Sequence, residues 1–230
     1  MIYITGDTHG DMNRFYGAFL PNEKSLTEKD FVIVCGDFGF VWELEGTREY
    51  IREKMILDEL EKKPYTILFC DGNHENFARL NSLPIKKWNG GKVHRIRKNI
   101  LHLMRGQVYM IDGRKFFSMG GAYSIDRHMR RENISFWKEE MPCAAEYNEA
   151  LKNLEANGFE VDYIISHTAP SDIIIAMGKS GDVHEWELTS FLGRLSYEVS
   201  FKKWFFGHWH TEKDIFGKFR ALWFDVCEIR

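Results

Sequence analysis

The sequence predicts an α/β fold built on mixed β-sheets, and three observations predict it. Short apolar runs rich in branched and aromatic residues alternate with helical patterns over the first part of the chain. From residue 107 the β pattern becomes denser, which indicates hairpins. The chain has 230 residues, 44% of them hydrophobic and 28% charged. Because one hydrophobic core serves a chain of this size, we expect a single domain over residues 1–230.

The expected strands are apolar runs bounded by polar or turn-forming residues. Their alternation with helices predicts parallel pairing with right-handed crossovers in the first part of the chain. Residues 81–106 form the least regular segment, and Asn89-Gly90-Gly91 marks a turn inside it. The expected strands are residues 2–4, 31–35, 66–70, 107–111, 115–119, 163–165, 204–206 and 219–226.

Four helices are expected between these strands. Asp11 can cap a helix over residues 12–20. The charged, periodic stretch 47–63 ends before Pro64, which sets the end of a second helix. A third covers residues 144–156, with Asn157-Gly158 as its stop signal, and a fourth covers residues 183–196.

The charge and the cysteines limit the classes of function. The net charge of -3 gives no general attraction to nucleic acid or to an anionic membrane. No apolar stretch approaches the roughly 18 residues that cross a bilayer, and no signal-peptide pattern precedes residues 2–4. We therefore expect a cytoplasmic protein with no membrane partner. The cysteines at positions 35, 70, 143 and 227 lack CxxC spacing, so we expect buried, reduced thiols.

Five short peptides rich in acidic residues and histidine each follow an apolar run. Taken singly, each has an ordinary explanation as a capping Asp, a tight turn or a structural His. Five in succession favour a shared site, because ligand sites gather outside the carboxyl ends of strands in α/β sheets. The peptides are GDTHG at residues 6–10, GDFG at 36–39, GNHE at 72–75, SHTA at 166–169 and GHWH at 207–210.

The residue types in the first three peptides suit a metal site. Asp7 and His9 lie two residues apart and can converge on one cation, and carboxylate with imidazole suits Mn, Fe or Zn. Asp37 supplies a second carboxylate, whose two oxygens can bridge two metal ions. Asn73 makes sense as a neutral oxygen ligand, which leaves the adjacent His74 free for proton chemistry.

In this order, the five peptides resemble those of the calcineurin-like metallophosphoesterase superfamily over residues 6–210. The resemblance implies a four-layer αββα sandwich, in which mixed β-sheets are flanked by helices, with two divalent metal ions at one end. Manganese is the expected metal, and Fe, Zn and Ni remain open. One ion would be bound by Asp7, His9 and His210, and the other by Asn73, His167 and His208, with Asp37 bridging the two.

The resemblance further implies a metal-dependent phosphoesterase that hydrolyses a phosphomonoester or a phosphodiester by attack of a metal-bridging hydroxide. Two divalent cations outweigh the two carboxylates, so the centre attracts phosphate. His74 would protonate the leaving oxygen or orient a phosphoryl oxygen. The partner would be a phosphate-ester small molecule or a nucleotide.

The chain departs from the phosphoprotein phosphatases of this superfamily. Those enzymes carry one Arg shortly after the second peptide and another after the third, to clamp phosphate. Here GDFGFVWE at residues 36–43 has no Arg, and Arg79 lies farther along than the second clamp position. The sequence therefore argues against a close relative of the Ser/Thr phosphatases.

Residues 120–142 resemble a segment in a bacterial and phage-associated branch of the superfamily. Gly120 and Gly121 would aim this segment at the rim of the site. Arg127, Arg130 and Arg131 would hold phosphate or a second anionic group, and Tyr123 and Trp137 would stack on a base. The alternative is a solvated basic stretch whose charges are balanced by acidic neighbours.

A basic cluster lies in residues 86–105, and its lysines and arginines with Trp88 suit a nucleic-acid backbone. A nuclease is therefore one alternative, although such clusters are usually solvated faces. A catalytically silent binding scaffold is another, disfavoured because every ligand position is filled. A hydrolase of the metallo-β-lactamase type would need an HxHxDH run, which this chain lacks. Oligomeric state stays open.

Overall fold

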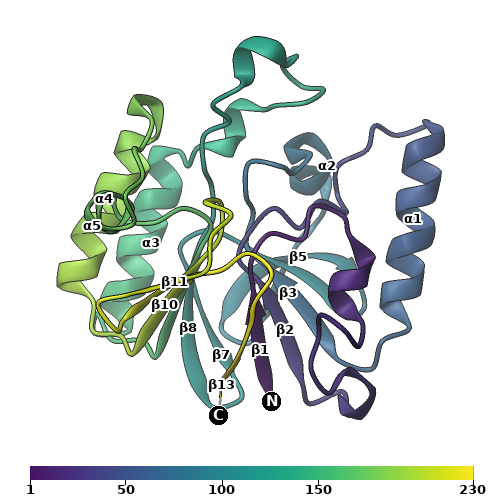
Figure 1. Ribbon diagram of the computed structural model, residues 1–230, viewed down its shortest axis with the longest axis horizontal. Coiled ribbons are helices and arrows are strands. Elements are labelled where there is room, and N and C mark those ends of the chain that lie inside the picture. Colours follow the sequence, from purple (N-terminus) through teal and green to yellow (C-terminus); the bar gives the residue numbers. More distant parts are fainter. Residues whose placement is uncertain (230) are drawn as a thin grey trace.

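The computed structural model describes residues 1–229 and confirms the predicted architecture of two mixed β-sheets flanked by helices (Figure 1). In sheet order, the first sheet consists of β13 (Val226–Ile229), β1 (Ile2–Thr5), β2 (Phe31–Val34), β3 (Thr66–Phe69), β6 (Ile100–Leu103), β5 (Gly91–Arg97) and β4 (Ile85–Trp88). The second consists of β11 (Lys213–Ile215), β12 (Phe219–Ala221), β10 (Lys203–Phe206), β9 (Tyr163–Ser166), β8 (Arg114–Met119) and β7 (Gln107–Ile111).

Helices cover the outer face of each sheet, which gives the four predicted layers. In Figure 1, α1 (Arg48–Glu61) and α2 (Phe77–Ser82) lie beside the first sheet. On the other side, α3 (Ala144–Ala156), α4 (Ser171–Ala176) and α5 (Trp186–Glu198) lie beside the second. The parallel pairing expected in the first part of the chain is confirmed for β1 with β2 and β2 with β3, and β9 also pairs with β10 in parallel. No helix within residues 1–229 combines the length and apolarity needed to cross a membrane.

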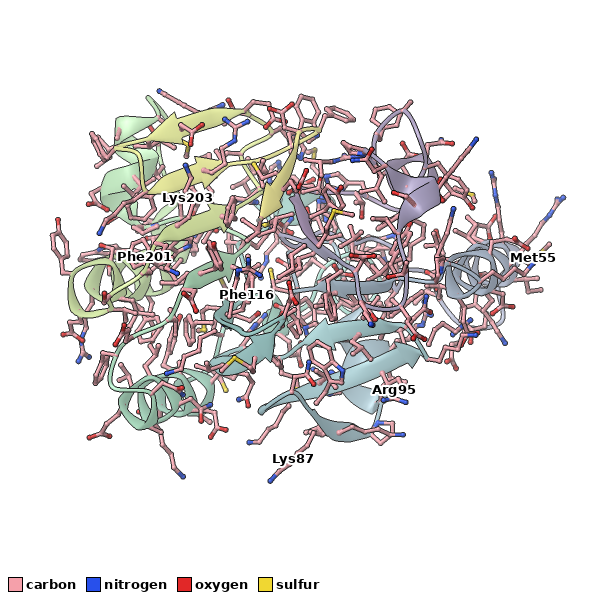
Figure 2. The ribbon with its side chains drawn as sticks, turned by 90° about the horizontal axis from the view of Figure 1, so that it is seen from below. Met55, Lys87, Arg95, Phe116, Phe201 and Lys203 are labelled. Atoms are coloured by element: carbon pink, nitrogen blue, oxygen red, sulfur yellow. The ribbon has the colours of Figure 1, made fainter. Side chains whose placement is uncertain are left out.

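Alternating side chains place three apolar layers around the two sheets. Ile4 of β1 packs between the sheets, against a layer that includes Phe116 and Phe205, whereas its neighbour Tyr3 packs on the helical side. Figure 2 shows Phe116 near the centre of the molecule. Because side chains in a strand alternate between faces, each central strand contributes to both the inner core and one outer core.

The expectation that residues 81–106 are irregular is wrong, because β4, β5 and β6 lie there. The predicted turn within this segment joins β4 to β5 as a hairpin. Trp88 pairs with Gly91, and the intervening Asn89 and Gly90 have φ of 46° and 97°. Two positive φ values are typical of the type I′ turn that joins tightly paired strands. Charged residues on the edge strand β4 disguised its pattern, since edge strands carry lysines that discourage further pairing.

The helix expected over residues 12–20 is also wrong. Asp11 does cap a helix, but this is one 3₁₀ turn, Met12–Phe15, and Tyr16 is extended. Arg14 is buried, and its guanidinium donates to the Asp7 carbonyl (2.9 Å) and to Thr5 Oγ1 (2.7 Å). This anchoring beneath the end of β1 overrides the helical pattern.

Some smaller elements also differ from expectation. The strand expected over residues 219–226 divides into β12 and β13, which join different sheets. Sequence reasoning did not identify α2, α4 and β11. Cys35 and Cys70 are buried as expected, whereas Cys143 is exposed and Cys227 is half-buried. The cause is position, since Cys143 precedes the surface helix α3 and Cys227 lies on the edge strand β13.

Candidate metal centre

The five acid- and histidine-rich peptides meet at one edge of the sandwich. They follow the carboxyl ends of β1, β2 and β3 in the first sheet and of β9 and β10 in the second. This edge lies opposite the N-terminus in Figure 1, and residues 120–142 project beyond it (teal, top). The site is therefore shared between the two sheets, with the connecting loops of both supplying side chains.

A first group of side chains consists of Asp7, His9 and His210. His210 Nε2 lies 3.1 Å from Asp7 Oδ2 and 3.1 Å from His9 Nε2. His9 Nε2 lies 3.8 Å from Asp7 Oδ2. Two imidazole nitrogens and a carboxylate oxygen thus face a common point, which is the arrangement expected of three ligands to one cation.

A second group consists of His167, Asn73 and Asp37. His167 Nε2 lies 3.2 Å from Asn73 Oδ1 and 3.4 Å from Asp37 Oδ1. The other ring nitrogen, Nδ1, lies 2.8 Å from the Cys35 carbonyl, which can only accept, so Nδ1 carries a proton. Nε2 then faces two oxygen acceptors, and a positive charge at this point, either a proton on Nε2 or a bound cation, satisfies all three atoms.

Asp37 connects the two groups. Its Oδ1 faces His167 and accepts a hydrogen bond from the His74 amide (2.7 Å), while Oδ2 lies 3.8 Å from His9 Nε2. Candidate ligand atoms lie within 4.8 Å of one another in three overlapping sets: Asp7, His9 and His210; His9, Asp37 and His74; and Asp7, Asp37 and His167. The overlap of these sets at Asp7, His9 and Asp37 gives one continuous acidic and imidazole-lined centre.

The ionisation of these groups also indicates that the centre suits a cation. Burial alone would lower the pKa of His167, but the Asp37 carboxylate outweighs it and raises this pKa to about 10. Burial would raise the pKa of Asp37, but the charge on His167 lowers it well below its usual range. Burial lowers the pKa of His208 to about 3 and also lowers that of His9. The buried carboxylate therefore draws positive charge, and His9 and His208 stay neutral, as metal ligation requires.

The backbone at the centre adopts unusual conformations. His9, Asp37, His208 and His210 all have positive φ, between 45° and 64°. A non-glycine residue in this region costs about 1–3 kcal/mol, and such residues concentrate at functional sites. The sharp turns at the strand ends aim these four side chains into the centre.

Two glycines allow the loops to approach the carboxylates. A Cβ at Gly207 would overlap Asp7 Oδ1 and lie 2.8 Å from the Cys35 carbonyl. A Cβ at Gly72 would overlap Asp37 Oδ1 and lie 2.8 Å from His167 Nε2. The glycines that precede His208 and Asn73 are thus required by close packing against the acidic groups.

Glu185 is a buried residue beside this centre that sequence reasoning missed. Its Oε1 accepts from the Tyr123 amide (3.0 Å) and lies 3.7 Å from His208 Nε2, and its Oε2 accepts from Thr168 Oγ1 (3.2 Å). Burial raises the pKa of Glu185. His208 therefore faces this carboxylate, while its ring packs edge-on against His167 at 4.9 Å. A lone Glu inside a predicted helix carried no signal for this role.

A cavity of about 760 Å³ opens over the centre, and residues 120–142 contribute part of its wall. Arg130 lines it, with Nη2 3.3 Å from His74 Nε2, and is held by Asp126 (2.7 Å). Tyr123 also lines it, stacked on His184 at 4.7 Å. The remaining lining residues include Asp37, Asn73, Ser124, Ile125, Lys179, Glu185, His208, Trp209, His210 and Trp223.

Other residues expected at the rim lie elsewhere. Arg127 does not line this cavity; its Nη2 pairs with the buried Glu140 (2.9 Å), and its guanidinium covers the Tyr123 ring at 4.1 Å. Trp137 is buried and contacts Trp42 edge-on at 5.5 Å. Both side chains therefore pack inside the segment of residues 120–142 and stabilise it.

The basic cluster of residues 86–105 divides between the surface and the core. Arg105 is buried against Asp71 (2.6 Å), Lys92 pairs with Glu149 (2.7 Å) and Arg97 pairs with Asp58 (2.9 Å). Lys87 and Arg95 are exposed at the edge of the first sheet (Figure 2), away from the cavity lining. Three of the cluster's cations are therefore paired with carboxylates, which reduces the positive charge that could attract a nucleic-acid backbone.

Comparison with known proteins gives one family. The family model of the calcineurin-like phosphoesterases, Metallophos, matches residues 1–212. This range includes all five peptides and the whole centre. Among curated proteins, none matches the chain.

Proposed function

Because this chain belongs to the calcineurin-like phosphoesterase family, we propose that it is a dinuclear metal-dependent phosphoesterase acting on a phosphate-ester small molecule or nucleotide. The observation that carries the proposal is the position of Asp37, whose two oxygens face the two ligand groups separately. A carboxylate that lies between two groups of candidate ligands is suited to bridge two cations. Divalent ions bound there would polarise the phosphoryl oxygens and lower the pKa of water, which is the chemistry that phosphate-ester hydrolysis needs.

The proposed ligand assignment follows the two groups. One ion would be held by Asp7, His9 and His210, and the other by Asn73, His167 and His208. Asp37 would bind both ions. His208 is assigned to the second ion because its ring contacts the His167 ring and because burial lowers its pKa, which keeps the imidazole neutral. Carboxylate, amide and imidazole ligands together suit Mn, Fe or Zn, and we propose Mn as the working metal.

His74 and Arg130 would act on the substrate. His74 is half-buried at the cavity wall and can donate a proton to the leaving oxygen. The guanidinium of Arg130 beside it can bind a phosphoryl oxygen, with the planar geometry that suits phosphate. Arg130 would thus supply, from residues 120–142, the clamp that the second and third peptides lack.

The first test is Asp37→Asn, which keeps the shape and removes one charge. With Mn²⁺, hydrolysis of an aryl phosphate ester is expected to fall at least a hundredfold. Asp112→Asn is the matched control, because Asp112 is an exposed hairpin residue with a similar φ of 49°. Undiminished turnover in Asp37→Asn would contradict the assignment.

The second test is His208→Ala. We expect this variant to lose activity and to keep the thermal unfolding transition of the wild-type protein. Metal analysis of the wild-type protein distinguishes an enzyme from a silent scaffold. About two metal ions per chain are expected. A protein that binds no divalent metal, and shows no activity with Mn²⁺, would favour the scaffold.

A further inference from the structure

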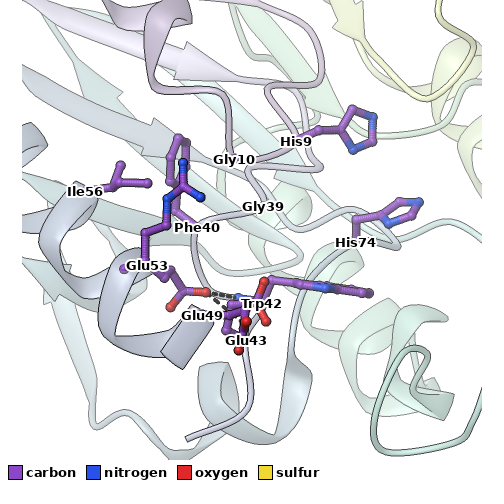
Figure 3. A pocket seen from close by; sticks show the side chains of 11 residues that line it. His9, Gly10, Gly39, Phe40, Trp42, Glu43, Glu49, Glu53, Ile56 and His74 are labelled. Atoms are coloured by element: carbon purple, nitrogen blue, oxygen red, sulfur yellow. Dashed lines mark hydrogen bonds between the residues drawn. The ribbon is translucent and has the colours of Figure 1, made fainter. Parts of the chain in front are cut away.

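A second cavity adjoins the metal centre. It measures about 350 Å³ and lies between the centre and α1 (Figure 3). His9 and His74 line both this cavity and the larger one over the metal centre. Their rings are in edge contact, with centroids 5.1 Å apart. Two separate cavities therefore open from the same pair of histidines.

We propose that the enzyme acts on a phosphodiester, with one alcohol group in the larger cavity and the other in the cavity beside α1. The inference rests on the proposed function, since it assumes that phosphorus is bound at the centre. A phosphomonoester has one organic group and needs one cavity. A phosphodiester has two, and the shared histidines place an opening on each side of the reacting phosphorus.

The second cavity has the shape and surface of a binding site for an organic group. Figure 3 shows His9 and His74 at one end, Ile56 and Glu53 at the other and Trp42 below. The Trp42 ring lies 5.5 Å from the His74 ring, so an apolar face continues from the centre into the cavity. An aromatic wall next to a half-buried Ile suits the carbon skeleton of an alcohol or a base.

The charges of this cavity disfavour a second phosphate. Glu43 and Glu49 line it, and neither forms an ion pair within residues 1–229. Glu53 also lines it, with its carboxylate bonded to Arg79 (2.6 Å) and to the Trp42 amide (2.8 Å). Burial raises the pKa of Glu43, and the carboxylates of Glu53 and Glu49 raise it further.

Arg52 is the one arginine among the described residues that lines this cavity, so the lining carboxylates outnumber the lining arginines. The group bound here would therefore be uncharged or cationic, with hydrogen-bond donors such as hydroxyl or amino groups. A nucleic-acid chain, whose next phosphate would enter this cavity, fits poorly. The acidic lining of this cavity therefore favours a small phosphodiester over a nucleic acid as substrate.

The reaction is a simple hydrolysis. The oxygen of water forms a bond to phosphorus, and the bond from phosphorus to one alcohol oxygen breaks. One proton of the water passes to the solvent or a base, and the leaving alkoxide takes a proton, for which His74 is the proposed donor. The products are a phosphomonoester and an alcohol.

The experiment compares 4-nitrophenyl phosphate with bis(4-nitrophenyl) phosphate in the Mn²⁺-loaded enzyme. Glu49→Trp and Arg52→Trp each place a large ring at an exposed position of α1 that faces the cavity. Met55→Trp is the matched control, because Met55 is exposed on α1 and does not line the cavity (Figure 2).

We expect kcat/KM for the diester to fall about tenfold in either cavity variant, with the monoester changed less than twofold. Parallel loss on both substrates, or no loss on the diester, would overturn the proposal. If the wild-type enzyme hydrolyses only the monoester, the diester proposal is overturned, but the proposed function as a phosphoesterase still stands. Absence of activity on both would overturn the proposed function itself.

The charge of the second group is tested with two mixed 4-nitrophenyl diesters. One carries a trimethylammonioethyl group and the other an alcohol that bears a phosphate. The cationic diester is expected to be hydrolysed at least tenfold faster. The opposite order would overturn the assignment of this cavity.

Discussion

The backbone amide of His208 donates to both carboxylate oxygens of Asp7, at 2.9 and 3.1 Å, across 201 positions of sequence. This contact joins the end of β10 in the second sheet to the end of β1 in the first. It also orients Asp7, whose Oδ2 then faces His210 and His9. The fit depends on Gly207, because no side chain can occupy the space next to Asp7 Oδ1.

Gly207→Ala is therefore expected to displace Asp7 and reduce both metal content and activity by at least tenfold. Gly193→Ala is the control, because a Cβ at this position in α5 meets only Ser171 Oγ at 3.9 Å. Alanine in a helix interior should stabilise the protein by about 0.5–1 kcal/mol. Metal analysis and thermal unfolding measure the two effects, and full metal content in Gly207→Ala would contradict the first.

Two of the three arginines expected to bind phosphate, Arg127 and Arg130, should differ in their mutant phenotypes. Arg127 pairs with Glu140, which is fully buried, so Arg127→Ala leaves a buried carboxylate without its cation. We expect the free energy of unfolding to fall by about 3 kcal/mol. Urea unfolding measures this loss, and Arg127→Lys should recover part of it. A change below about 0.5 kcal/mol would show that the pair contributes little.

Arg130→Ala is expected to act on catalysis instead. Its guanidinium lies at the cavity wall beside His74, and its ion pair with Asp126 is partly exposed. Exposed pairs contribute roughly 0–1 kcal/mol, so stability should change little. We expect kcat/KM for an aryl phosphate to fall at least tenfold. Unchanged kinetics would remove Arg130 from the substrate site.

The strands that position the centre were predictable because each is a run of apolar residues followed at once by the peptide with the polar side chains. Asp37 illustrates this, since β2 ends at Val34 and Asp37 follows within three residues. The order of the peptides was sufficient to predict the family and the four layers. The unusual backbone at His9 and Asp37 was signalled only by the neighbouring glycines.

The remaining features depend on contacts that local sequence does not encode. Glu185 reaches His208 because η5 (Val183–Glu185) packs against the loops after β8 and β9. Arg127 turns to Glu140 because that carboxylate is buried and needs a cation. Because glutamate is a common metal ligand and arginine a common phosphate-binding residue, only tertiary packing distinguishes the roles of these two residues.

The exposed lysines of β4 should be dispensable for activity. Lys86 and Lys87 are exposed and line neither cavity at the metal centre. Lys86→Glu with Lys87→Glu reverses two charges and is expected to leave kcat/KM for aryl phosphates within twofold of wild type. Because these residues lie outside the site, the dependence of KM on salt concentration should also be unchanged. A clear loss of activity would restore the nuclease interpretation.

Buried His94 should make the protein less stable in acid. Its Nδ1 lies 3.1 Å from His102 Nδ1, and His102 in turn contacts Asp71 (3.0 Å). Burial, with a further contribution from His102, lowers the pKa of His94 to about 4, from 6.5 in an unfolded chain. The unfolded state therefore binds the proton first, and stability is greatest above pH 6.5 and declines as pH falls toward 4.

Between pH 7 and pH 5, this single group should reduce the free energy of unfolding by roughly 2 kcal/mol. His94→Asn removes the titrating group, so its urea midpoint is expected to depend less steeply on pH than that of the wild type. His128→Asn is the control, because His128 is exposed and lies on the loop of residues 120–142. Equal pH dependence in wild type and His94→Asn would show that His94 does not control the acid stability of the fold.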